Sequence, residues 1–231
     1  IGRYSLDLAK ALLRNRGSHE VAFVANQAFS AHDAELAAEL AECGGVGPID
    51  RYALLPLAGF QSNARRGRQR VNDALLNWQY ACARPDLIHV SSVFEGWVSG
   101  DAHVARNPTE VPGAICSATL YDLIPLIFDD VYLSREVRPD YFAKLGVFSQ
   151  LDVVLAISES ARQDAISRLG LAPERVTNIR GATSARFRRI ADLDPSRARA
   201  VLGRHGLGAR FLLYTSGIDH RKNNHTLIDA Y

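Results

Sequence analysis

The sequence is poor in the residues that sulfur chemistry and membrane insertion require. Three cysteines and no methionine occur among its 231 residues. An odd number of cysteines at wide spacing excludes a disulfide framework, and no Cys-x-x-Cys pair indicates zinc. We therefore expect reduced thiols in a cytoplasmic protein. No stretch approaches about 18 uncharged apolar residues, so we expect neither a membrane-spanning helix nor, from the polar opening, a signal peptide.

Several functional signatures are also missing. The net charge of +2 gives no reason to expect a nucleic-acid partner. The P-loop, the Gly-x-Gly-x-x-Gly fingerprint and the Gly-x-Ser-x-Gly elbow are absent, and the histidines show no pair at metal spacing. The chain begins at Ile1 and ends at Tyr231 inside an expected helix. We therefore expect it to be a fragment of a longer protein.

Short apolar runs alternate with amphipathic helices along most of the chain. Runs that are apolar on both faces predict strands covered on both sides, which is typical of a parallel sheet. A run at residues 53–57 is a weaker strand, since its proline suits only an edge or an end. The other expected strands cover residues 21–25, 87–90, 114–120, 153–157, 176–179 and 211–214.

Helix signals fill the segments between these strands. Ser30 and Asp33 form a predicted capping pair. Helices are expected at 4–14, after 33, at 64–83, at 135–149, at 158–169 and after 194. The third of them carries a predicted apolar stripe of Val71, Leu75, Leu76 and Trp78. This alternation predicts an α/β fold with a doubly wound parallel sheet.

Ligands of such sheets bind at the carboxyl ends of strands and face helix N-termini, which selects two candidate phosphate loops. Gly2 and Arg3 precede the first helix, where a glycine lets the backbone approach an anion. Arg221 and Lys222 lie between the strand at 211 and the last helix, and together suit a phosphate. The alternatives are a simple turn at Gly2 and a solvated basic loop at 221–222.

Two further loops carry groups that hold sugars. Asp122, after the strand at 114–120, could accept hydrogen bonds from a sugar hydroxyl or cap the next turn. Glu95, Gly96 and Trp97 place an aromatic ring beside a carboxylate, which binds the C–H face and the hydroxyls of a sugar. A ring packed in the core is the alternative for Trp97.

Four arginines crowd the start of the helix expected at 64–83, namely Arg65, Arg66, Arg68 and Arg70. Cations at this end oppose the helix dipole. A polyanion, lipid phosphates or an anionic membrane surface would relieve the conflict. A solvated arginine-rich face is the alternative.

Four motifs, in order and at matching spacing, resemble glycosyltransferase family 4. They are Gly2-Arg3-Tyr4 before a helix, Tyr121-Asp122-Leu123-Ile124-Pro125, Ala156-Ile157-Ser158-Glu159-Ser160, and Gly217 through Asn223. The nearest likeness is to bacterial mannosyltransferase-like enzymes of surface polysaccharide synthesis. The resemblance implies a GT-B fold of two Rossmann-like domains. Residues 1–187 would be the acceptor-side domain without its first strand, 188–207 a connector, and 208–231 the truncated start of the nucleotide-sugar domain.

The resemblance also implies a function. It is a retaining transfer of a hexose, with mannose as candidate, from a nucleotide-sugar to a glycan or lipid-linked acceptor at the cytoplasmic face of the membrane. No metal or cofactor is implied, because cationic side chains and helix N-termini stabilise the leaving diphosphate. The implied roles are catalysis for Tyr121 and Asp122, diphosphate binding for Gly2, Arg3, Arg221 and Lys222, and acceptor or sugar binding for Glu95, Gly96, Trp97, Ser158 and Glu159.

The chain departs from the family pattern at several positions. Tyr121 stands where many members have histidine, and Ile218 where many have arginine. The family's Glu-x7-Glu pair would lie beyond Tyr231, so we expect the chain alone to be inactive. A non-catalytic glycan- or partner-binding domain derived from a transferase is the alternative function. A sugar-nucleotide epimerase is less favoured, because the dinucleotide fingerprint is absent.

Overall fold

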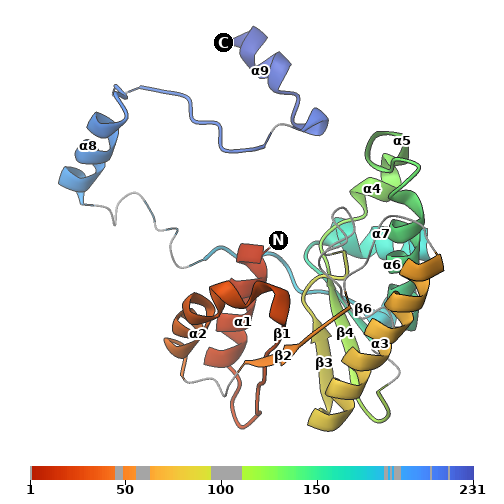
Figure 1. The fold of residues 1–231 in the computed structure, drawn as a ribbon. Helices are drawn as coiled ribbons and strands as arrows, with labels where there is room; N and C mark the ends of the chain where they lie inside the picture. The colour runs from red at the N-terminus through yellow and green to blue at the C-terminus, as the bar shows by residue number, and fades with distance from the viewer. Residues whose placement is uncertain are drawn as a thin grey trace. The chain divides into compact units, whose positions relative to one another are not determined.

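The protein is represented by a computed structural model (Figure 1), which describes residues 2–44, 49–55, 63–94, 111–184, 187, 189, 194–208, 210–217 and 219–231. The chain divides into two compact units, Ile1–Ala182 and Thr183–Tyr231, each described here by itself. The predicted domain boundaries at 187 and 207 stay predictions.

Helices and strands alternate through the first unit. Its helical elements are α1 (Gly2–Arg14), η1 (Gln27–His32), α2 (Asp33–Ala41), α3 (Asn63–Ala83), α4 (Ile124–Ile127), α5 (Asp129–Tyr132), α6 (Arg138–Gln150), α7 (Glu159–Leu169) and η3 (Pro173–Arg175). Its strands are β1 (Val24–Asn26), β2 (Asp50–Tyr52), β3 (Leu87–Val90), β4 (Ile115–Leu120), β5 (Val153–Ala156) and β6 (Val176–Asn178). The second unit contains α8 (Pro195–Arg204), η5 (His220–Lys222) and α9 (Asn224–Ala230).

All strand pairs described in the structure are parallel. β1 pairs with β2, and a second sheet has the order β3-β4-β5-β6. In the second sheet Val90 lies opposite Ala118, and Leu120 lies opposite Ala156. The carboxyl ends of β3, β4 and β5 therefore meet at one edge. The prediction of an α/β fold with parallel sheets is confirmed.

The core lies between this four-stranded sheet and the helices beside it (Figure 1). Residues 116–120 of β4 are all buried, which agrees with a strand covered on both faces. Tyr141 and Phe148 of α6 and Ala165 of α7 pack in the same apolar cluster. A smaller cluster of Leu13, Leu40 and Cys43 joins α1 to α2.

Three strands differ from the prediction. β1 begins at Val24, while Val21 and Phe23 pack against the smaller cluster and the Phe23 carbonyl accepts from the Asp50 N–H at 2.9 Å. β2 precedes the apolar run at 53–57, of which residues 56–57 lie outside the described residues. Residues 211–214 form no strand, although they are apolar, and their side chains are exposed. A strand needs a neighbour for its N–H and C=O groups, and the described part of the second unit contains none.

One predicted helix cap is formed and another is wrong. The Ser158 hydroxyl accepts a hydrogen bond from the Ala161 N–H at 3.1 Å, and Gly170 ends α7 in the left-handed conformation at φ 66°. At α2 the predicted cap residue Ser30 is not the N-cap. The chain enters α2 through the turn η1, and the cap position falls on His32 without a side-chain cap bond.

The apolar stripe predicted for α3 mostly faces outward. Val71, Leu75 and Trp78 are 46%, 42% and 69% exposed, and only Leu76 is buried. Buried polar side chains occupy the inward face, and Asn72 is completely covered. Side-chain amides satisfy main-chain groups near β2 from this face, and this explains why a polar face could turn inward.

Candidate functional site

Two of the predicted ligand loops meet at the carboxyl edge of the four-stranded sheet. Tyr121 follows β4 directly, and its hydroxyl lies 2.9 Å from the Ser5 hydroxyl in the first turn of α1. The rings of Tyr4 and Tyr121 meet edge to face, with centroids 5.5 Å apart at 79°. No described atom lies within 4 Å of the position a Cβ would take on Gly2. The start of α1 therefore offers open backbone beside the Tyr121 side chain.

Arg3 is engaged by carboxylates at the same helix start. Its guanidinium forms ion pairs with Asp7 and Glu39, each at 3.3 Å. Lys10, which is buried, pairs with Glu39 as well. The Lys10 hydrogen bond, followed by the charge of Arg3, lowers the pKa of the Glu39 carboxyl. These contacts tie α1 to α2, and the diphosphate role of Arg3 stays a prediction.

Asp122 caps the turn that leads into α4, and Leu123 is the N-cap residue of that helix. The Asp122 Oδ1 accepts a hydrogen bond from the Ile124 N–H at 3.0 Å, at the entrance to α4. The capping alternative considered for this residue is therefore present. Asp122 also acts on Tyr141 of α6, because burial and the nearby Asp122 charge both raise the pKa of that phenol.

Tyr141 connects the loops that follow β3 and β4. Its ring stacks on Phe94, with centroids 4.9 Å apart and planes at 17°. Ser92, between β3 and Phe94, is buried, and its hydroxyl has no hydrogen-bond partner within the described part of the chain. Sequence reasoning assigned Ser92 no role, although its place just after a buried strand was the available signal. Glu95, Gly96 and Trp97, which come next, lie outside the described residues.

His89 joins two strands through a buried polar cluster that sequence reasoning also missed. Its Nδ1 lies 2.9 Å from the Ser117 hydroxyl, and its Nε2 lies 3.0 Å from the Thr119 hydroxyl. Ser117 also donates to the Ile88 carbonyl at 3.2 Å. Burial lowers the pKa of His89, so the ring is held neutral, with one nitrogen donating and the other accepting. Thr119 lies near the carboxyl end of β4, two residues before Tyr121.

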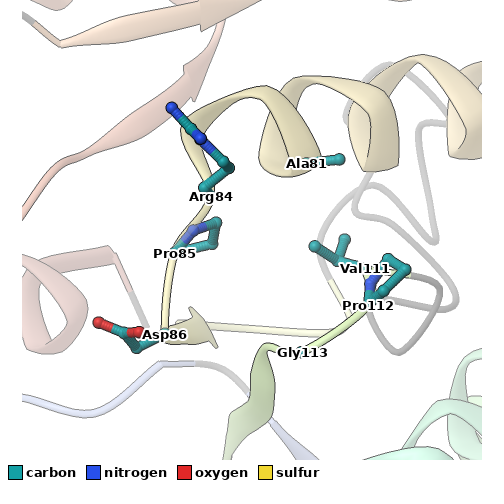
Figure 2. A pocket seen from close by; sticks show the side chains of 7 residues that line it. All are labelled: Ala81, Arg84, Pro85, Asp86, Val111, Pro112 and Gly113. Atoms are coloured by element: carbon teal, nitrogen blue, oxygen red, sulfur yellow. The ribbon is translucent and has the colours of Figure 1, made fainter.

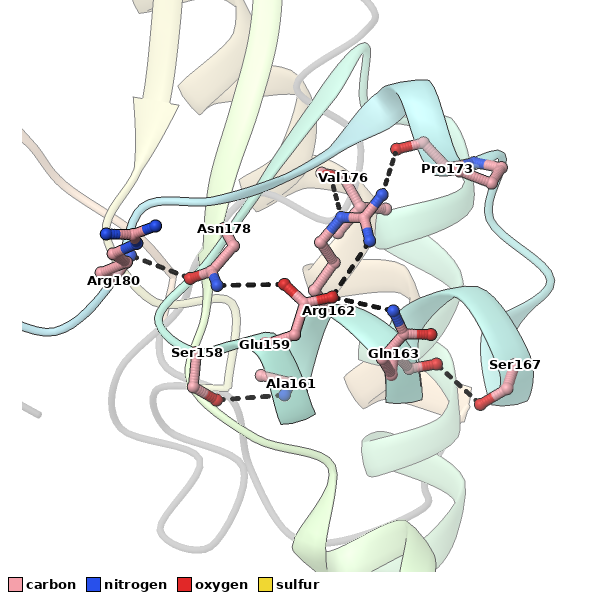
Figure 3. Close-up of polar contacts among 10 residues, drawn as sticks. All are labelled: Ser158, Glu159, Ala161, Arg162, Gln163, Ser167, Pro173, Val176, Asn178 and Arg180. Atoms are coloured by element: carbon pink, nitrogen blue, oxygen red, sulfur yellow. Dashed lines mark hydrogen bonds and ion pairs between the residues drawn. The ribbon is translucent and has the colours of Figure 1, made fainter.

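Ser158 and Glu159 belong to a network at the ends of β5 and β6 (Figure 3). Ser158 caps α7, as described above. Glu159 accepts hydrogen bonds from Gln163 at 2.8 Å, Asn178 at 3.1 Å and Arg162 at 3.2 Å. The pKa of the Glu159 carboxyl is lowered mainly by the hydrogen bonds from Gln163 and Asn178. The structure thus uses Glu159 to join α7 to β6, and its sugar-binding role stays a prediction.

The basic loop of the second unit contains one paired and one unpaired cation. Arg221 donates to Asp219 through its main-chain N–H and through Nε, both at 3.0 Å. Lys222 is exposed, and none of the described residues pairs with its ammonium group. Lys222 is therefore the better placed of the two to receive an anion.

Figure 2 shows a pocket in the described part of the first unit. It has a volume of about 370 Å³ and is lined by Ala81, Arg84, Pro85, Asp86, Val111, Pro112 and Gly113. Asp86 and Gly113 precede β3 and β4, so the pocket opens at the amino ends of these strands, opposite to Tyr121. Ligands of open α/β sheets bind at the carboxyl ends, and we therefore do not place the functional site in this pocket.

Two structural absences bear on the site. Across residues 2–44, 49–55, 63–94, 111–184 and the described parts of the second unit, no group of three or more His, Cys, Asp or Glu side chains is arranged to hold a metal. Over the same residues, no helix has both the length and the hydropathy to cross a bilayer. The side chains of Arg65 and Arg66 lie outside the described part, while Arg68 and Arg70 are exposed.

The parallel sheets, the flanking helices and the polar groups at one sheet edge define a Rossmann-like α/β domain of the GT-B type. A solved glycosyltransferase from Rickettsia africae ESF-5 has this fold: its TM-score is 0.51 at 15% identity, over 90% of this chain and 46% of that one. The chain belongs to Glycosyltransferase Family 4, whose family model matches residues 1–186.

Curated relatives add a more specific likeness. The serotype-specific mannosyltransferase WbdA of Escherichia coli is 30% identical over 237 residues, which cover 100% of this chain and 27% of that protein. A second WbdA of the same species is 29% identical over 230 residues, or 97% of this chain. The chain thus spans about a quarter of the length of the curated relatives it matches.

Proposed function

We propose that the chain is part of a retaining glycosyltransferase that moves a mannosyl group from a nucleotide-sugar to a growing surface glycan or a lipid-linked acceptor. The observation that carries this proposal is the junction of Tyr121 with Ser5 and Tyr4. It brings two family motifs, 116 residues apart in sequence, to one sheet edge. The name of the WbdA relatives supports the choice of mannose as the sugar.

In this proposal the leaving diphosphate is stabilised by the chain's own cations and backbone. The free N–H groups at the start of α1, beside Gly2, face the phosphate oxygens. Lys222 supplies a point charge, and Arg221 assists when it leaves Asp219. The departing oxygen helps to take the proton of the incoming hydroxyl on the same face of the sugar, and the anomeric configuration is retained. This arrangement requires neither a metal nor an organic cofactor.

The acceptor side of the site involves the carboxyl ends of β3 and β4. The Tyr141–Phe94 stack holds the start of the segment that continues to Glu95, Gly96 and Trp97, and the buried Ser92 hydroxyl lies just before it. We infer that this segment contacts the acceptor, and that the enzyme works in the cytoplasm at the inner face of the membrane.

The test is nucleoside diphosphate release by the full-length parent protein, supplied with GDP-, UDP- or dTDP-sugars and a lipid-linked glycan. Release from GDP-mannose, reduced about 100-fold or more in Lys222→Ala, would support the proposal. Arg199→Ala is the matched control, because Arg199 is an exposed cation on α8 outside the proposed site. No release from any donor would refute the transferase and favour a glycan-binding domain. If the Lys222→Ala variant releases diphosphate at the wild-type rate, Lys222 does not bind the donor.

A further inference from the structure

Helix α3 exposes an apolar face that none of the residues described in the structure covers. Val71, Leu75 and Trp78 stand four and three residues apart, a spacing that places them on one side of a helix. All three are exposed, and so is Cys82, four residues beyond Trp78. We call Val71, Leu75 and Trp78 the outer stripe. Large apolar side chains gathered in this way mark an interaction surface more often than scattered ones do.

Hydrogen bonds to the main chain hold this face outward. The Asn72 Oδ1 accepts from the Leu55 N–H at 2.8 Å, and its Nδ2 donates to the Leu55 carbonyl at 3.0 Å. About two turns further along the helix, Gln79 donates to the Arg51 carbonyl at 3.0 Å. A rotation of α3 that buried the outer stripe would break all three bonds and expose these amides. The orientation of the stripe is therefore a property of the fold.

The charge along α3 indicates which kind of partner could cover the outer stripe. Four arginines fall within the first eight residues of the helix, and Asp73 is its one acidic residue. Cations at a helix start are unfavourable unless an anion lies opposite them. Two copies paired in parallel through this face would bring arginines against arginines, so charge opposes that dimer. An occupant that combines negative charge with an apolar interior complements both the arginines and the outer stripe.

We propose that α3 lies in the surface of an anionic lipid bilayer, with the outer stripe among the acyl chains and Arg68 and Arg70 at the headgroups. Basic amphipathic helices that carry tryptophan and leucine bind membranes in this way. α3 has 21 residues and is not apolar enough to cross a bilayer, so in this proposal it lies along the surface. The inference rests on the proposed membrane-side location of the enzyme and assigns that contact to specific side chains.

The first experiment is flotation of the 231-residue chain with vesicles of phosphatidylcholine containing 30% phosphatidylglycerol, and with vesicles of phosphatidylcholine alone. We expect binding to the anionic vesicles that falls as salt is added. Replacement of the outer stripe by serine (V71S, L75S, W78S) should weaken binding at least tenfold. The matched control is L212S with L213S, which removes two exposed leucines from the second unit. R68Q and R70Q should each weaken binding about fivefold.

Tryptophan fluorescence then reports the position of α3. Trp78 and Trp97 are the two tryptophans, so Trp97→Phe isolates the signal of Trp78. On anionic vesicles its emission should shift to shorter wavelength and be quenched by brominated acyl chains.

Several outcomes would overturn the inference. They are no vesicle binding, binding that the serine variant retains, and a bound protein whose Trp78 is not quenched. Self-association abolished by the same serines would make a second copy the occupant instead. Nucleoside diphosphate release by the full-length protein is measured separately with soluble donors. Release without vesicle binding would refute only the membrane contact, whereas vesicle binding without release would refute only the transferase.

Discussion

Replacement of His89 by leucine tests the buried polar cluster between β3 and β4. Leucine keeps apolar volume but removes both ring nitrogens, and with them the contacts to Ser117 and Thr119. Ser117 keeps its bond to the Ile88 carbonyl, whereas the buried Thr119 hydroxyl loses its imidazole partner. A lost hydrogen bond contributes about 1 kcal/mol and a buried unsatisfied hydroxyl about 1–3 kcal/mol. We expect the free energy of unfolding to fall by about 2–3 kcal/mol at pH 7.5.

This loss should depend on pH, because burial lowers the pKa of His89. Above the ordinary imidazole pKa of about 6.5, both folded and unfolded chains carry a neutral ring. As the pH falls below that value, the unfolded chain binds a proton that the folded chain resists. The stability of the wild type then decreases by up to about 1.4 kcal/mol per pH unit until the lower folded pKa is reached. His89→Leu lacks this dependence, so its deficit should shrink by about 1 kcal/mol between pH 7.5 and 5.5.

Urea unfolding followed by far-UV circular dichroism at both pH values measures these differences. His19→Gln is the matched control, since the His19 side chain is exposed and its replacement should leave stability unchanged. Thr119→Val in the His89→Leu background should recover part of the loss, because it removes the hydroxyl left without a partner. A His89→Leu deficit below about 0.5 kcal/mol, or one unchanged between the two pH values, would refute the reasoning.

Three further changes test other contacts. Asn72→Ala leaves the Leu55 main-chain groups without their amide partner and should lower the free energy of unfolding in urea by about 2 kcal/mol. A change within error of zero would contradict the role of Asn72 in fixing the orientation of α3. Tyr121→Phe removes the bond to Ser5 and should cost only about 1 kcal/mol of stability. In the full-length protein it should slow diphosphate release about tenfold, and an unchanged rate would exclude the hydroxyl from the site. Hydrogen bonds hold the pKa of Glu159 below its usual value, so its stabilisation is present above about pH 4.5 and disappears as the pH falls through the lower folded pKa. Glu159→Gln should therefore reduce the drop in melting temperature between pH 6 and pH 3.5, and an equal drop in both proteins would refute this assignment.

The central strands of the parallel sheet could be predicted from the sequence. β3, β4 and β5 were predicted within one residue, because each is a short, mostly apolar run bounded by polar residues. The run at 211–214 looks the same in sequence and forms no strand. An apolar run indicates what a segment can bury, and pairing then depends on whether another strand lies beside it.

The face of α3 could not be predicted from its periodicity. The pattern correctly placed Val71, Leu75 and Trp78 together, but it could not say that they point outward. That outcome depends on hydrogen bonds from Asn72 and Gln79 to main-chain groups distant in sequence. At the site, Tyr121 could be predicted because ligands bind where parallel strands end. Its contact with Ser5 could not be predicted, because the two residues are distant in sequence and meet only in the folded chain.

The inward amides of α3 also separate two properties that most helices combine. In an ordinary amphipathic helix the same apolar residues stabilise the fold and form the binding surface. A substitution that alters binding there also alters stability. Here hydrogen-bonded amides on the inner side help to hold the helix in place, so the residues at 71, 75 and 78 are free to vary with little effect on folding. Evolution, or an engineer, could therefore change where this domain attaches without rebuilding its core.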